Sequence, residues 1–137
     1  MNLADDLIAT LPVLRAQAES LMVDECIIRR GTGETVVDPN TGAVVDGPGA
    51  TVYEGKCKVQ SKDSATASPY AAGHSFVLVS RQVHIPANAA DVEDDDVVEI
   101  TASKFNSLGV GKKYRVEGFT PDTFDTAFRL PVKEMTS

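Results

Sequence analysis

Apolar residues recur along the first part of the chain with the spacing of one helix face. The stripe consists of Leu3, Leu7, Leu11, Leu14, Ala18 and Leu21. Steps of three and four predict an amphipathic α-helix over residues 1–22, and its five leucines are the expected docking face. Asn2 is the expected N-cap, and Asp5 and Asp6 fall in the first turn, where the helix dipole favours carboxylates. Pro12 predicts a kink or a restart of the helix, because proline lacks a backbone donor and disfavours helical backbone just before it.

From residue 23 onward the period changes to the alternation of β-strands. Strands are predicted over 24–30, 51–60, 75–85, 97–101, 114–119 and 126–134, with a short hairpin over 35–45. Pro131 lies in the last segment and predicts an edge strand or a strand end. Short strands at hairpin spacing predict a mainly β fold, a small antiparallel β-barrel (or sandwich) of about six to seven strands preceded by one N-terminal α-helix. The whole chain, 1–137, is predicted to be one domain, with the β part over 23–137.

Two long excursions interrupt this pattern, near 38–49 and 61–73. The first holds the hairpin tip, where Asp38, Asn40 and Thr41 suit bent backbone. The second is rich in Ser and Ala and has no strand period, which predicts a long mobile loop; such loops are usually functional or disordered. The residues expected to contact a channel or a neighbouring subunit are Ser61, Lys62, Asp63, Ser64, Ser68, Tyr70 and His74.

Composition narrows the class of protein. Of the 137 residues 42% are hydrophobic, which is enough for a core and too many for a disordered chain. The formal net charge of −7 argues against sequence-specific binding of nucleic acid, which needs clustered Lys and Arg. The acidic N-terminus is unlike a signal peptide, and no apolar run approaches the ~20 residues of a membrane span. The chain is therefore expected to be soluble and intracellular when made, without a membrane partner.

None of the motifs considered for a metal, disulfide or phosphate site is complete in this sequence. Cys26 and Cys57 are too few and too far apart for a zinc site or a disulfide framework, and both are predicted to be small buried hydrophobes. The acidic run 91–96 lacks the central Gly of a calcium loop and is predicted to be a solvated loop. Residues 109–113 lack two positions of a phosphate loop and predict a hairpin turn.

The two histidines, His74 and His84, have no nucleophile motif beside them, so neither is predicted to be catalytic. No catalytic, cofactor or metal site is expected, and the function is expected to lie in surfaces and loops.

Several segments resemble a known group of viral proteins. The likeness at the start is carried by Leu3-Ala4-Asp5-Asp6-Leu7, Leu11-Pro12-Val13-Leu14-Arg15, Glu19-Ser20-Leu21-Met22 and Cys26-Ile27-Ile28-Arg29-Arg30. Further on it is carried by 53–59, 83–86, 96–98, 114–119 and 127–132. In chain order these segments resemble the head-to-tail joining proteins of long-tailed bacteriophages, in particular the stopper, or head-completion, group of phages of actinobacteria.

The resemblance implies a non-enzymatic β-barrel subunit of the virion neck, assembled in the host cytoplasm. Such subunits form a homo-oligomeric ring, six- or twelve-fold, with the portal and adaptor above and the tail terminator and tail tube below. The ring closes the filled head, and packaged DNA passes its channel without sequence-specific binding. Two alternatives remain open: another neck protein, such as the tail terminator or the portal adaptor, and a small ligand-binding or hydrolytic β-barrel.

Overall fold

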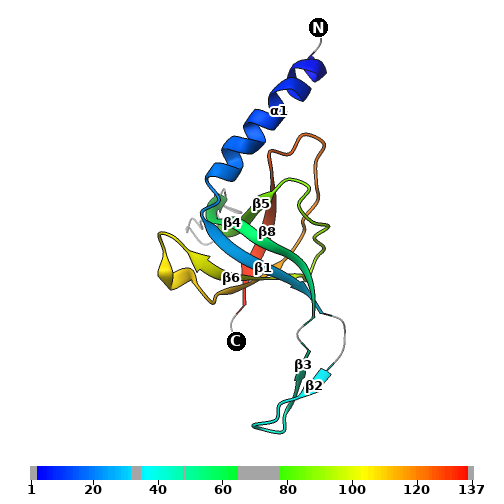
Figure 1. Cartoon of the computed structure of the whole chain (residues 1–137), viewed down its shortest axis with the longest axis vertical. Helices are drawn as coiled ribbons and strands as arrows, with labels where there is room; N and C mark the ends of the chain where they lie inside the picture. Colours follow the sequence, from blue (N-terminus) through cyan, green and yellow to red (C-terminus); the bar gives the residue numbers. More distant parts are fainter. Residues whose placement is uncertain (1–2, 32–34, 48, 65–77, 136–137) are drawn as a thin grey trace, which may run out of the picture.

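The computed structural model describes residues 3–31, 35–47, 49–64 and 78–135. Its helix is α1 (Leu3–Ser20), and a 3₁₀ turn, η2 (Ser107–Gly109), follows the sixth strand. The strands are β1 (Asp24–Arg30), β2 (Thr35–Val37), β3 (Val44–Asp46), β4 (Ala50–Ser64), β5 (Leu78–Pro86), β6 (Val97–Ser103), β7 (Lys113–Val116) and β8 (Ala127–Glu134). Figure 1 shows the helix at one end of the molecule and the β2–β3 hairpin at the other.

Six strands close into an antiparallel barrel in the order β1-β4-β5-β8-β7-β6. β1, β4 and β5 form one meander, and β6, β7 and β8 form a second. Pairing of β1 with β6 and of β5 with β8 joins the two meanders and closes the barrel. The predicted fold is confirmed, and closure decides for the barrel over the sandwich.

Alternation along the strands fills the barrel with small and medium-sized apolar side chains. The fully buried members are Cys26, Ile28, Cys57, Val83, Ile85, Val98, Val116 and Leu130. Cys26 and Cys57 lie on β1 and β4, which pair, and both thiols are free and buried, as predicted. Their mutual hydrogen bond and their burial raise the pKa of the Cys57 thiol. A thiol held neutral in this way is a packing residue and a poor nucleophile.

An ion pair between Arg30 and Asp96 joins the end of β1 to the segment that leads into β6. The Arg30 guanidinium, at the end of β1, donates to both carboxylate oxygens of Asp96 at 2.9 Å, and its pKa is raised chiefly by this hydrogen bond. Asp96 also accepts the backbone N–H of Glu93 at 2.8 Å and is only 2% exposed. Asp94 accepts the backbone N–H of Gly118 at 2.8 Å. The prediction of a solvated acidic loop is confirmed for the exposed Asp91, Glu93, Asp94 and Asp95 and is wrong for Asp96, which is buried against Arg30.

Helix α1 continues through Pro12 as one helix, so the predicted restart does not occur. It begins at Leu3 and ends at Ser20, where the backbone N–H of Met22 closes a last turn on the carbonyl of Glu19. Met22, which follows this turn, is buried. The predicted N-cap, Asn2, lies outside the described residues.

Pro131 lies inside the closed barrel and not at an edge, so that prediction is wrong. Its carbonyl accepts the backbone N–H of Glu117 at 2.9 Å, which places its missing N–H on the side of β7. β7 ends at Val116, which pairs with Val132. The proline therefore sits where its neighbour strand has just ended, and a missing donor costs the ladder little.

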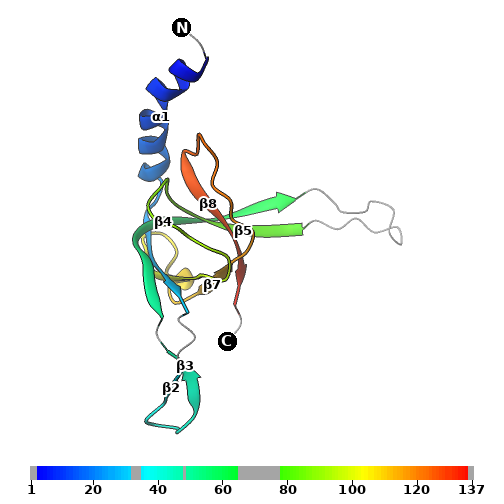
Figure 2. The ribbon, with the colours of Figure 1, turned by 90° about the vertical axis from the view of Figure 1, so that its right-hand side faces the viewer.

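The predicted start of the loop 61–73 is wrong, because the strand before it is longer than the pattern indicated. Residues Ser61 to Ser64 belong to β4 and pair with Arg81 to Leu78 of β5. The two strands run on past the rest of the barrel as a two-stranded arm, which Figure 2 shows projecting to one side. Antiparallel pairing with β5 stabilises this polar segment as strand, a long-range contact that the local pattern does not reveal. The turn predicted at 109–113 is confirmed between β6 and β7, with Gly111 at φ +87°.

Candidate assembly surfaces

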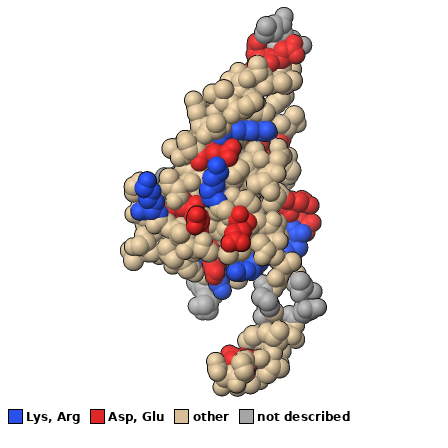
Figure 3. All heavy atoms as spheres, viewed as in Figure 1, with Lys and Arg blue, Asp and Glu red and all other residues tan. Residues whose placement is uncertain are grey.

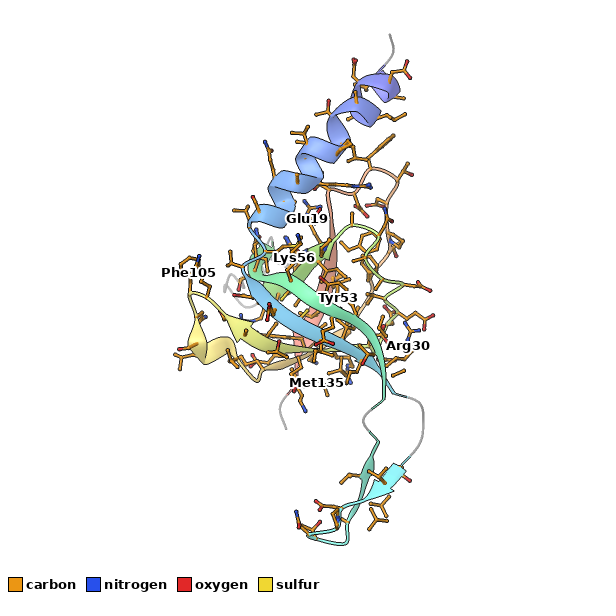
Figure 4. All side chains as sticks on the ribbon, in the orientation of Figure 1. Glu19, Arg30, Tyr53, Lys56, Phe105 and Met135 are labelled. Carbon is orange, nitrogen blue, oxygen red and sulfur yellow. The ribbon has the colours of Figure 1, made fainter. Side chains whose placement is uncertain are left out.

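Two polar interactions tie the C-terminal half of helix α1 to the rest of the chain. Arg15 Nε donates to the carbonyl of Asp125 at 3.0 Å, and Glu19 pairs with Lys56 Nζ at 2.9 Å. Figure 4 shows Glu19 and Lys56 facing each other where the helix meets the barrel. The N-terminal half extends beyond the strands, as both Figure 1 and Figure 2 show.

The predicted docking leucines are largely uncovered. No residue of α1 is buried, and Leu3 is 74% exposed. Leu14 and Leu21 are also exposed, whereas Leu7 and Leu11 are half-buried. Exposed apolar residues lie off the stripe as well, at Ile8 and Val13. An amphipathic helix in water is stable mainly when its apolar face is packed, so this helix presents a face suited to another chain.

The β2–β3 hairpin is a second projection. Its valine pairs Val36–Val45 and Val37–Val44 lie on alternate faces, and each of the four valines is 44–68% exposed. A two-stranded ribbon on its own is marginally stable in water. Apolar side chains on both faces therefore suit a ribbon inserted between two neighbouring surfaces.

The predicted tip residues hold the hairpin turn together. Asp38 Oδ1 accepts the backbone N–H of Asn40 at 2.8 Å, and Asp38 O accepts that of Gly42 at 2.8 Å. Thr41 Oγ1 accepts the backbone N–H of Ala43 at 3.3 Å. Gly42 has a φ of +72°, a conformation that glycine adopts without strain. The side chains of Asp38 and Thr41 therefore bond to the backbone of the turn itself and hold it in shape.

Of the residues predicted to contact a channel or neighbour, Ser61, Lys62, Asp63 and Ser64 lie on β4 within the arm. Ser68, Tyr70 and His74 lie outside the described residues. The structure thus separates the arm from the hairpin and the helix, and these three projections leave the barrel in different directions (Figure 2).

The turn between β6 and β7 forms a fourth apolar surface that the sequence patterns missed. Phe105 is 78% exposed and Leu108 85% exposed, and Figure 4 shows Phe105 at the outer edge of the molecule. A groove of about 450 Å³ separates this turn from Leu21 and Val23 at the end of α1. In the sequence, this surface could have been recognised from Phe105 and Leu108, two large apolar residues inside a turn rich in Asn, Ser and Gly.

His84 lies on the outer face of the barrel and is 8% exposed. Burial, then the charges of Lys58 and Arg129, lowers its pKa to about 4. Its Nε2 lies 3.2 Å from Oε1 of Gln82. Among the described residues no carboxylate is recorded on this neutral histidine, and neither cysteine lies beside it because both are inside the barrel.

Charges of both signs are interspersed on the face that Figure 3 shows. No group of three or more Asp, Glu, His or Cys side chains within the described residues could hold a metal ion. No helix among them is long and apolar enough to cross a membrane.

The fold thus defines a small closed antiparallel barrel with an N-terminal helix and apolar projections. The sequence matches the model of a family of unknown function, DUF6093, over residues 14–133, and the chain belongs to that family. The match covers the end of α1 and nearly the whole barrel. No curated protein and no solved structure matches the chain.

Proposed function

We propose that this chain is a non-enzymatic structural subunit of the head-to-tail connector of a long-tailed bacteriophage, acting as the stopper ring. The observation that carries an assembly role is the exposure of apolar side chains on elements that leave the barrel. The valines of the hairpin and the leucines of α1 are the main examples. Large apolar patches on a soluble chain mark surfaces that other chains cover.

The barrel does not need the hairpin for its own closure. Arg30, the last residue of β1, pairs directly with Ala50, the first residue of β4. The chain between them is therefore an insertion at a point where a two-residue turn would suffice. An element that contributes nothing to the core but carries four exposed valines is better explained by contact with a partner than by folding.

The stopper role itself is supported by the sequence resemblance and by the closed barrel with separate projections. A ring subunit needs different surfaces for its two ring neighbours and for the rings above and below. The helix and the hairpin leave opposite ends of the molecule (Figure 1), an arrangement suited to contacts along the neck axis.

The test replaces residues 31–49 by Asn-Gly in the phage that encodes the chain. We expect the purified variant to keep a cooperative thermal unfolding transition, because the barrel pairings remain. Virions carrying it should package DNA, fail to retain it and lack tails. A milder companion variant changes all four hairpin valines to threonine, which preserves β propensity and removes the apolar contact.

Two outcomes would redirect the proposal. Tails of abnormal length on filled heads would assign the chain to the tail terminator. Normal infectious virions from both variants would show that the hairpin has no role in the neck.

A further inference from the structure

The outer face of β4, β5 and β8 is basic, although the chain as a whole is acidic. Lys58 pairs with His84, and His84 pairs with Arg129, so these residues form one row across three strands. The next row is polar and neutral and consists of Gln60, Gln82 and Pro131. Lys133 follows Pro131 on the same face of β8, since side chains alternate. No described position of these rows is Asp or Glu.

These cations have no carboxylate partner within the described part of the chain. The ion pairs there join other residues, and Arg129 uses one guanidinium nitrogen on the Thr126 hydroxyl at 3.0 Å. The end of α1 covers part of the face and leaves a groove of about 420 Å³, walled by Ala18 and Leu21. Lys58 and Arg129 both lower the pKa of His84, which indicates positive potential at the groove floor.

Carboxylates outnumber cations in the turn 91–96, although Arg30 pairs with Glu93 and Arg115 with Asp95. Asp91, Glu93 and Asp95 are exposed in the turn that leads into β6, and the side chain of Asp95 is 87% exposed. Asp94 and Asp96 pin this turn to the ends of β7 and β1. The turn borders β7: Asp95 lies 4.0 Å from Arg115, and Arg115 pairs with Lys133 of β8.

We propose that copies of this chain bind one another head-to-tail, with the acidic turn 91–95 of one copy on the basic face of the next. The basic face is defined by Lys58, Arg129 and Lys133. The inference rests on the proposed ring and names its lateral contact. Complementary patches at different places on one molecule give a heterologous contact, which generates a closed ring when the rotation closes.

Exposed ion pairs add little binding free energy, and their role here is to select the partner and the register. The apolar projections then supply the buried area.

The experiment is a charge swap measured by sedimentation velocity of the full chain over a range of concentrations at low salt. One variant carries Lys58→Glu and Arg129→Glu, and the second carries Asp91→Lys and Glu93→Lys. In either variant alone, both sides of every contact carry charges of the same sign. We therefore expect self-association at least tenfold weaker than that of the wild type. An equimolar mixture restores opposite charges at every contact, so it should assemble as the wild type does, with even numbers of subunits.

Two controls carry single charge reversals of the same two kinds elsewhere, Lys104→Glu and Glu54→Lys, both on exposed residues outside the two surfaces. We expect them to assemble normally. Because Glu93→Lys places a cation beside Arg30, a neutral variant with Asp91→Asn, Glu93→Gln and Asp95→Asn tests the same surface without that repulsion. This variant should also associate more weakly.

The proposal is overturned if the wild type does not self-associate, if either swapped variant assembles normally, or if the mixture is not restored. A fall in affinity for duplex DNA with unchanged self-association would instead assign the basic face to nucleic acid. None of these results bears on whether virions lacking the hairpin lose DNA and tails, so failure of this contact is distinguishable from failure of the neck assignment.

Discussion

His84 should make the stability of the protein fall steeply as the pH drops below about 6.5. Its pKa is about 4 in the folded chain, against an ordinary value of 6.5, because it is buried and flanked by Lys58 and Arg129. Between these two values the unfolded chain binds a proton that the folded chain does not. Stability from this group is therefore complete above pH 6.5 and is lost as the pH falls toward 4.

The size of the effect follows from the two pKa values. The loss in free energy of unfolding is about 1.4 kcal/mol at pH 5.5, about 2 kcal/mol at pH 5 and about 3 kcal/mol at pH 4. The burial of His84, which is 8% exposed, supports this magnitude because solvent screens the charges only weakly there. For a domain whose total stability is of the order of 5–15 kcal/mol, this is a large fraction.

The assay is urea denaturation at a series of pH values from 8 to 4, on the wild type and on His84→Gln. Glutamine is neutral throughout and can keep a hydrogen bond to Gln82, so its curve reports all other titrating groups. The difference between the two curves should grow by about 2 kcal/mol between pH 7 and pH 5. A constant difference over that interval would refute the argument, since it would mean that His84 titrates alike in both states.

Three further predictions concern the stability of the barrel, and each is measured by urea denaturation as a change in the midpoint and in the free energy of unfolding. Ile28→Ala should cost about 3 kcal/mol because the side chain is fully buried, whereas Ile27→Ala, on the outer face of the same strand, should cost much less; equal losses would contradict the assigned faces. Gly49→Ala should destabilise by more than about 1 kcal/mol, because φ is +73° and the new Cβ would lie 2.7 Å from the last carbonyl oxygen of β1. Asp96→Asn should lower the midpoint clearly more than Asp95→Asn, because only Asp96 is buried and hydrogen-bonded to a guanidinium through both oxygens; the reverse order would contradict a stabilising role of the Arg30–Asp96 ion pair.

The sequence was informative wherever a local period sets the structure. The leucine stripe predicted α1 to within two residues at its C-terminal end, and 24–30 was predicted as a strand with the bounds that β1 has. Alternation also placed Cys57 and Val83 in the core. These features follow from side-chain periods of 3.6 and 2, which a linear pattern records.

Long-range pairing was beyond such patterns. The extension of β4 through Ser64 depends on β5, and the place of Pro131 inside the barrel depends on where β7 ends. The helix stripe likewise predicted an apolar face but not whether the barrel covers it. In the structure Leu3, Leu14 and Leu21 of that face are exposed.

The sequence by itself therefore determined the class of fold, the helix, most strands and the buried cysteines, because each is set by neighbours close in the chain. Tertiary structure decided which surfaces are free. It alone placed β5 opposite β6 and brought Lys58, His84 and Arg129 into one row, because closure of the barrel fixes the positions of residues that are far apart in sequence.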